Sequence, residues 1–126
     1  MNKLLFIATT FVLLSSCQND PGEQISESWE SLDGRRLMES KCFSCHNTQG
    51  TDDMLAPPMF RVKDHYWEEG ITEESFIKAI SEWVKNPIEE NSVMPGARRK
   101  FGIMPKQEFD ESEVKAIAKY MYNNEI

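Results

Sequence analysis

The sequence predicts an all-α protein with three or four helices joined by long loops. Apolar residues recur at helical spacing in the segments before residue 87 and after residue 110, and no segment alternates polar and apolar residues as a strand does. The chain has 126 residues, enough for one domain with a single core. We therefore expect one helical domain at residues 29–126, preceded by a separate N-terminal leader.

Residues 1–16 have the pattern of a signal peptide. Lys3 precedes an apolar run at residues 4–14, and small residues follow it. The run is shorter than the roughly 20 residues that cross a bilayer as a helix. We therefore expect export from the cytoplasm rather than a lasting transmembrane anchor.

The leader ends in the letters "LSSC", which resemble the lipobox of bacterial lipoproteins. We expect cleavage before Cys17 and lipidation of its thiol; the alternative is a general secretory signal in which Cys17 is incidental. Residues 17–28 are rich in Pro, Gly, Ser and acidic residues and are expected to form a flexible tether. The protein would then be held on a membrane through lipid.

The chain that remains after residue 16 is acidic, with 13 basic and 21 acidic residues and a formal charge of −8. This charge argues against binding to nucleic acid, because phosphates require a basic surface. It also argues against binding to anionic lipid by charge. We expect a protein partner with a basic docking surface.

The first expected helix begins after Asp33, whose carboxylate can cap it. The chain has a helical pattern from about Trp29, and Leu37 and Met38 are spaced to face a core ahead of Cys42. Residues 56–60, "APPMF", contain two adjacent prolines, which exclude helix there and favour an extended loop.

The second expected helix follows Thr72 as its cap and stops before Pro87. Its apolar stripe consists of Phe76, Ile77, Ile80, Trp83 and Val84. Residues 88–109 show no regular period. A last helix begins at Asp110, with Glu113 completing a capping box. Its buried face consists of Val114, Ile117, Ala118 and Met121.

Cys42, Cys45 and His46 form a C-x-x-C-H motif, which is the attachment signature of c-type haem. On one helical turn, two thiols three residues apart can form thioethers with both vinyl groups of a porphyrin, and the next imidazole can bind the iron. A thioredoxin-like disulfide would need strands that the sequence lacks. A zinc site would need a further ligand, for which His65 is the only histidine left.

From about residue 33 to residue 123 the chain resembles a monohaem class I cytochrome c. Gly34 and Met38 stand where the family has a glycine and a large apolar or aromatic residue before the first haem cysteine. Ile117 and Tyr120 match the apolar–aromatic pair of the family's C-terminal helix. The resemblance implies a cytochrome c fold around one covalently bound haem, with Gly34 letting the two terminal helices cross closely.

The resemblance also implies two further contacts of the iron ligands. A proline carbonyl after the motif accepts a hydrogen bond from the proximal imidazole, and either Pro57 or Pro58 is at about the right separation from His46. The sixth ligand in the family is a methionine shortly before the C-terminal helix, often followed by proline, which Met104 fits best. Met94, also followed by proline, remains an alternative.

The other candidates for the sixth ligand are less well placed. His65 would give a bis-histidine site, and it also stays open. Met54 and Met59 lie close in sequence to the proximal loop, and Met121 lies on the core face of the last helix. The basic cluster of residues 98–100, "RRK", could contact haem propionates or a partner, or could be a solvated loop.

The function implied by the resemblance is one-electron transfer without catalytic residues, because a six-coordinate haem has no open site. We expect a lipid-tethered carrier on the periplasmic side of a bacterial membrane, moving electrons between respiratory complexes. Two alternatives stay open: a haem enzyme or gas sensor with a labile sixth ligand, and a fixed cytochrome subunit of a larger oxidoreductase.

Overall fold

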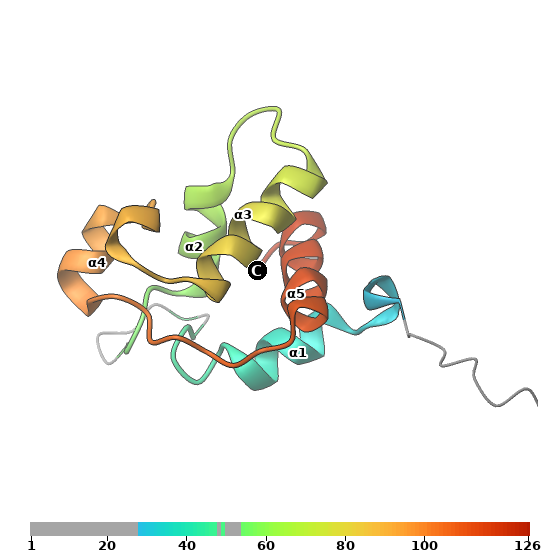
Figure 1. The fold of residues 1–126 in the computed structure, drawn as a ribbon, viewed down its shortest axis with the longest axis horizontal. Coiled ribbons are helices and arrows are strands. Elements are labelled where there is room, and N and C mark those ends of the chain that lie inside the picture. Colours follow the sequence, from blue (N-terminus) through green and yellow to red (C-terminus); the bar gives the residue numbers. More distant parts are fainter. Residues whose placement is uncertain (1–27, 48, 50–53) are drawn as a thin grey trace, which may run out of the picture.

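The computed structural model describes residues 28–47, 49 and 54–126, and the described chain is entirely helical. It contains five α-helices and two short 3-10 helices, with no strand among these residues (Figure 1). The elements are η1 (Trp29–Ser31), α1 (Gly34–Lys41), α2 (Met59–Tyr66), α3 (Glu73–Lys85), η2 (Glu89–Asn91), α4 (Pro95–Phe101) and α5 (Glu111–Asn123). The all-α fold class is confirmed, with more helices than the three or four expected.

The three helices expected from periodicity begin at the expected caps. The Asp33 carboxylate accepts a hydrogen bond from the Arg36 backbone N–H at 3.0 Å at the start of α1. Thr72 accepts one from the Ser75 backbone N–H at 3.2 Å at the start of α3. Asp110 begins α5 with a capping box, as expected from its acidic N3 residue. Each cap satisfies N–H groups that have no partner inside the helix.

Two helices were not expected from the sequence. Helix α2 begins directly after Pro58, which has an extended backbone. The expectation of an extended loop over residues 56–60 was therefore wrong for Met59 and Phe60, which are the first two residues of the helix. Helix α4 lies inside the segment whose apolar residues show no regular spacing. Pro95 is in its first turn, where a backbone N–H has no partner inside the helix, so the missing N–H of proline costs no hydrogen bond. No residue of α4 is buried, so it has no apolar stripe to detect.

Helices α1, α3 and α5 pack together into the core (Figure 1). The largest fully buried side chains come from these three helices and are Phe76, Met38 and Met121. All four residues expected on the inner face of α5 are buried. The apolar spacing of these helices therefore located the core correctly.

Helices α1 and α5 cross in direct backbone contact at Gly34. A Cβ atom at this position would lie 2.8 Å from the Tyr120 Cβ and would collide with the Ala116 carbonyl oxygen. Only glycine permits this approach, which brings the start of α1 against the backbone of α5. The close crossing expected at Gly34 is confirmed.

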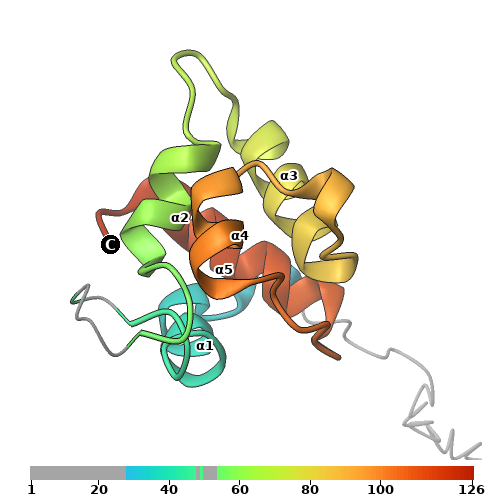
Figure 2. The ribbon, with the colours of Figure 1, turned by 90° about the vertical axis from the view of Figure 1, so that its left-hand side faces the viewer.

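Helix α4 lies at one end of the molecule, away from the packed helices (Figures 1 and 2). It ends at Gly102, whose φ of 80° is a conformation that favours glycine. The chain turns there and returns toward α5 as an extended segment that carries Met104. Helix α4 and this segment form one side of the cavity described below.

No helix in the described ranges is long and apolar enough to cross a membrane. The expected signal peptide, the lipidation site at Cys17 and most of the tether lie outside these ranges. They remain predictions from the sequence.

Candidate functional site

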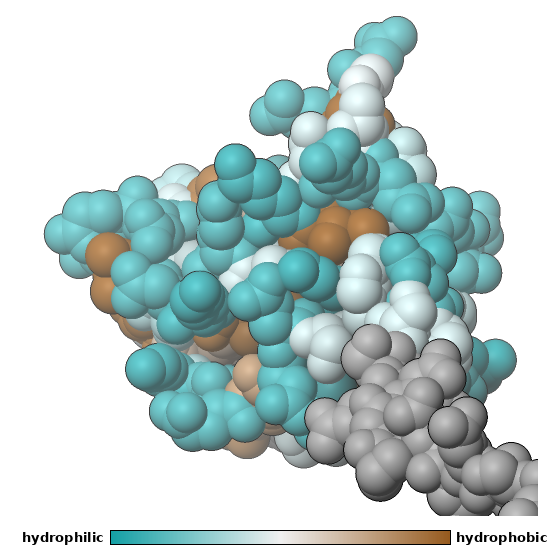
Figure 3. Space-filling model, turned by 45° about the vertical axis from the view of Figure 1, so that its right-hand side comes forward, coloured by the Kyte–Doolittle hydropathy of each residue, from teal (hydrophilic) through white to brown (hydrophobic). Residues whose placement is uncertain are grey.

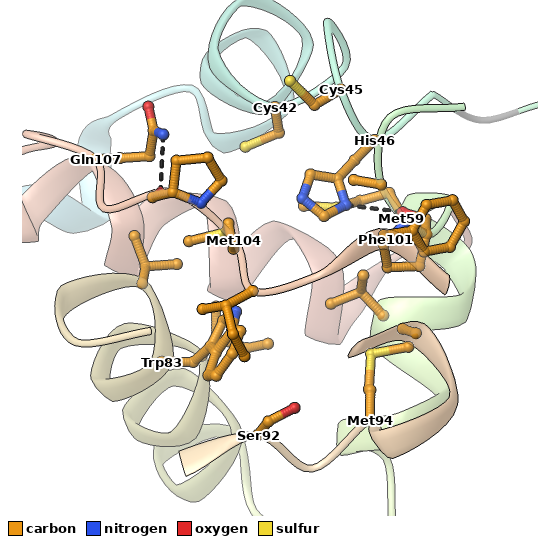
Figure 4. A pocket seen from close by; sticks show the side chains of 18 of the residues that line it. Cys42, Cys45, His46, Met59, Trp83, Ser92, Met94, Phe101, Met104 and Gln107 are labelled. Carbon is orange, nitrogen blue, oxygen red and sulfur yellow. Dashed lines mark hydrogen bonds between the residues drawn. The ribbon is translucent and has the colours of Figure 1, made fainter. Parts of the chain in front are cut away.

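A cavity of about 400 Å³ lies between the packed helices and α4 (Figure 4). Its walls are mostly apolar, and no Asp or Glu is among the residues that line it. Helices α3 and α5 contribute Ile80, Trp83, Val114, Ile117 and Met121. The apolar faces of α3 and α5 therefore pack in the core and also line the cavity.

The three motif residues lie together in one wall of this cavity (Figure 4). Helix α1 ends at Cys42, and a tight turn follows in which the backbone N–H groups of Cys45 and His46 donate to the Cys42 carbonyl at 3.2 and 2.8 Å. This turn places both thiols and the imidazole on a single short segment, as the motif predicted.

The end of α1 is fixed to α5 by a half-buried ion pair. The Lys41 ammonium lies 3.0 Å from the Glu113 carboxylate, which also accepts the backbone N–H of Asp110 at 3.4 Å. Lys41 lies over the Phe109 ring as well, 5.2 Å from its centroid. Because Lys41 directly precedes Cys42, these contacts hold the motif against the start of α5.

The imidazole of His46 is oriented by Pro57. His46 Nδ1 lies 2.7 Å from the Pro57 carbonyl oxygen, which can only accept, so Nδ1 carries the proton. Nε2 then has a free lone pair with which to bind a metal. Burial lowers the pKa of His46 below its usual value, although the Pro57 hydrogen bond opposes this, and the ring is neutral at pH 7. Of the two prolines considered, Pro57 makes the contact.

The thiol of Cys42 is unsuited to thiolate chemistry. Burial raises the pKa of Cys42 to about 11, so the thiol is neutral at physiological pH. No disulfide joins Cys42 to Cys45. The described residues contain no cluster of three His, Cys, Asp or Glu side chains that could hold a metal ion. The raised pKa of Cys42 is unfavourable for a redox-active thiolate.

Two methionines that were considered as sixth ligands line the cavity away from the motif. Met94 precedes α4, and Met104 lies in the extended segment between α4 and α5 (Figure 4). The Gln107 side-chain amide donates to the Pro105 carbonyl at 2.9 Å, which braces the segment directly after Met104. Sequence reasoning did not identify Gln107, because only the folded loop brings the two groups together.

The remaining candidates are placed less favourably. His65 is exposed on α2, its Nδ1 lies 2.9 Å from the Arg61 carbonyl oxygen, and it does not line the cavity. Met59 and Met121 line the cavity but are buried in helices. Met54 lies outside the lining. The structure therefore brings His46 together with Met94 and Met104, and does not bring His65 to them.

Trp83 of α3 and Arg98 of α4 both line the cavity. The Arg98 guanidinium lies 2.9 Å from the Glu89 carboxylate of η2. Residues 98–100, for which a solvated loop was one alternative, lie in helix α4; Arg98 lines the cavity, and Arg99 and Lys100 are exposed.

A family model described as cytochrome c matches residues 31–125, which is most of the chain. The chain belongs to the cytochrome c family. No curated protein and no solved structure matches the chain. Membership in this family implies a covalently bound haem c, and the spacing of Cys42 and Cys45 fits its attachment motif. The protein is therefore a c-type cytochrome and an electron-transfer haem protein.

The residues around the cavity fit this cofactor. An apolar cavity without carboxylates suits a porphyrin, and a neutral imidazole with Nδ1 occupied suits an iron ligand. When bound, haem c supplies an iron that takes up and releases one electron. Cys42 and Cys45 would hold the group through their thiols, the Pro57 contact would fix the ring of His46, and the apolar side chains would exclude water.

Proposed function

We propose that this cytochrome is a lipid-anchored one-electron carrier on the periplasmic side of a bacterial membrane, with His46 and Met104 as the axial ligands of its iron. The observation that carries the proposal is that a neutral imidazole and a methionine thioether line the same apolar cavity. A soft thioether favours ferrous iron and raises the reduction potential. With both axial positions taken, the site exchanges electrons and does not bind a substrate.

Met104 is favoured over Met94 for a structural reason. Met104 lies in an extended segment that Gln107 braces, six residues before the cap of α5. Met94 is the residue that precedes the first turn of α4, and its backbone carbonyl accepts the Arg98 N–H at 3.0 Å at the start of that helix. A ligand in a braced extended segment can approach a metal without unwinding a helix.

Paired alanine substitutions test the ligand. Met104→Ala should abolish the Met–iron charge-transfer band and lower the reduction potential substantially, because water or another side chain would replace the thioether. Met94→Ala is the matched control and should leave both nearly unchanged, at a packing cost of roughly 2–5 kcal/mol at most. Visible spectroscopy and potentiometric titration measure these effects.

Two outcomes would change the proposal. If Met94→Ala abolishes the band and Met104→Ala does not, the ligand is Met94. If neither variant alters the spectrum, His65 becomes the candidate, and His65→Ala should then vacate the site. A wild-type protein that binds carbon monoxide readily in the ferrous state would indicate a labile site and an enzyme or gas sensor instead of a carrier.

The proposed anchor rests on the lipobox-like sequence before Cys17. Cys17→Ser should prevent lipid addition and release the cytochrome from membranes with its spectrum unchanged. Membrane fractionation of cells that produce each form measures the effect. Membrane association that persists in the variant would contradict the lipid anchor and indicate a protein partner or an uncleaved signal.

The proposed partners are respiratory redox proteins. A tether of about a dozen residues would keep the haem domain close to the membrane and raise its effective concentration near membrane-bound partners. The overall acidity of the chain supports partners that present a basic docking surface.

A further inference from the structure

A groove distinct from the haem cavity runs along the contact between α3 and α5, and we call it the α3–α5 groove. Glu73 at the start of α3 accepts a hydrogen bond of 2.8 Å from Asn123 at the end of α5, so the two helices run in opposite directions. Trp29 of η1 lines the groove, and so do residues 106–109, which lead into the start of α5. The groove therefore extends from η1 toward the segment that follows Met104.

The floor of the α3–α5 groove is apolar. Five apolar side chains line it: Trp29, Ile77, Val84, Phe109 and Val114. The Ser81 hydroxyl also lines it, and its oxygen is buried without a hydrogen-bond partner in the described part of the chain. On the side of the molecule that carries η1, the space-filling view shows an apolar patch surrounded by hydrophilic side chains (Figure 3). An apolar floor with an unpartnered hydroxyl is stabilised when a peptide covers it.

Two lysines of the groove form no ion pair within the described ranges, and they lie at opposite ends of it. Lys119 lies over the Trp29 ring, 5.5 Å from its centroid, whereas Lys85 is the last residue of α3. A hydrogen bond from Lys115 and the charge of Lys85 lower the pKa of Glu111, which places Lys85 beside the start of α5. Lys119 is about 12 Å further along α5 than Glu111, at 1.5 Å per residue.

The sequence directly before the described fold carries a pattern that matches this groove. Residues 23–27 read "EQISE" and lie outside the described residues. In an extended backbone alternate side chains share one face, which would bring Glu23, Ile25 and Glu27 together and turn the two residues between them the other way. The two carboxylates would then be about 13 Å apart, close to the spacing of the two unpaired lysines. Ile25 is the only large apolar residue of residues 18–28.

We propose that the α3–α5 groove binds residues 23–27 of the same chain in extended form. Ile25 would cover the apolar floor, and the peptide backbone would offer the Ser81 hydroxyl a partner once that side chain rotates. The segment needs no linker to reach the groove, because Trp29 lies in its wall and directly follows Ser28. A segment so close in the chain has a high effective concentration at its site, so a small contact suffices to hold it.

The register of the segment follows from the direction of the chain. Going back from Trp29 along the groove, the first carboxylate is that of Glu27, which would meet Lys119 at the same end. Glu23 would then meet Lys85 at the other end. These pairs would be partly exposed, so each contributes little alone, and the apolar contact at the centre contributes the larger part.

Docking would shorten the reach of the haem domain from the membrane, a consequence that rests on the proposed lipid anchor. Residues 18–27 span at most about 35 Å, whereas residues 18–22, which docking leaves unbound, span at most about 18 Å. Four residues line both the groove and the haem cavity: Val84, Gln107, Phe109 and Val114. The docked segment would therefore also pack behind one wall of the haem site.

Proteolysis of the haem-loaded protein in mild detergent tests the docking. Glutamyl endopeptidase cleaves after glutamate, and mass spectrometry gives the rates of cleavage after Glu23 and Glu27. Ile25→Ser should raise both rates about tenfold, because the protease acts on the undocked form. Gln24→Ser is the matched control: it introduces the same residue on the opposite face of the extended segment, and the rates should stay within about twofold of wild type. Cleavage after Glu69 in the exposed α2–α3 loop is the internal reference.

A substitution in the groove tests the same contact from the other side. Lys85→Glu should raise the rate of cleavage after Glu23 about threefold at low salt, because it replaces attraction by repulsion. Lys100→Glu makes the same change of charge at an exposed position of α4 that does not line the groove, and it should have no effect. Protection should not depend on protein concentration, because the segment and the groove belong to one chain.

The proposal is overturned if the wild type and Ile25→Ser are cleaved at the same rate, or if Gln24→Ser has as large an effect as Ile25→Ser. Protection that disappears on dilution would also overturn it, since the occupant would then be a second copy of the chain. These rates depend neither on the sixth ligand nor on lipid at Cys17. Failure here therefore leaves the tests of Met104 and of the lipid anchor untouched.

Discussion

The two sides of the haem cavity are built in different ways. Helices α1, α3 and α5, which we call the packed half, contain the fully buried side chains of the protein. The other side, residues 88–110, which we call the cap, contains no buried residue although it includes α4 and the proposed ligand Met104. The packed half is stabilised by its own side chains, whereas Phe109 is the one residue of the cap that packs against the core cluster among the described residues. The motif residues follow directly on the packed half, whereas the proposed sixth ligand lies in the cap.

The largest effect should come from losing the covalent attachment of the haem, which both halves contact. Cys42→Ala with Cys45→Ala should leave largely unfolded apoprotein, because Ile80, Val114 and Ile117 would then face an unfilled cavity. Circular dichroism measures the loss of helix. As a control, the wild type should retain its haem through acid–organic extraction. Retention of native helicity in the double variant would show that the packed half folds alone.

A substitution at the crossing of α1 and α5 should destabilise the packed half. Gly34→Ala should lower the free energy of unfolding by about 3 kcal/mol, because the new Cβ would collide with backbone and would force the helices apart. Gly96→Ala in α4 is the matched control, since its Cβ would meet nothing within 4 Å. It should be neutral or stabilising by up to about 1 kcal/mol. Equal destabilisation by both would mean that the crossing is not decisive. Denaturant unfolding of the holoprotein measures both.

Alkaline pH should weaken the protein through Tyr66, which lies on α2 and lines the cavity. Burial raises the pKa of Tyr66 from about 10 to about 12, so the unfolded chain loses this proton first. Stability is therefore full below pH 10 and falls between pH 10 and 12, by about 1–3 kcal/mol. Tyr66→Phe should show a shallower loss over this window in denaturant unfolding. An identical slope in both proteins would contradict the assignment.

The smallest effect should come from loosening the cap at Gln107. Gln107→Leu removes the amide that braces Pro105, a loss of about 1 kcal/mol, and should let imidazole displace Met104 about fivefold more readily. Spectrophotometric titration with imidazole measures this. Lys106→Ala is the control and should leave the affinity unchanged, because Lys106 is exposed and forms only a long surface ion pair. No difference between the two variants would show that Gln107 does not position the ligand.

The packed half could be predicted well from the sequence, and the cap could not. Apolar residues at helical spacing located α3 and α5, because those side chains face a core made by the same chain. Helix α4 has no such pattern, since its inner side faces the cofactor cavity. Helix α2 did carry a signal, because Met59, Val62 and Tyr66 are spaced three and four residues apart and all line the cavity. The adjacent prolines before Met59 predicted extended backbone there instead.

The sequence by itself predicted the roles of Cys42, Cys45 and His46, because the attachment motif lies within five consecutive residues and needs only one turn of backbone. The tertiary structure decided which proline carbonyl meets His46, since the two adjacent carbonyls of an extended backbone point in different directions. It also decided which methionines reach the cavity. These properties depend on contacts and charges brought together from distant parts of the chain, which spacing along the sequence does not encode.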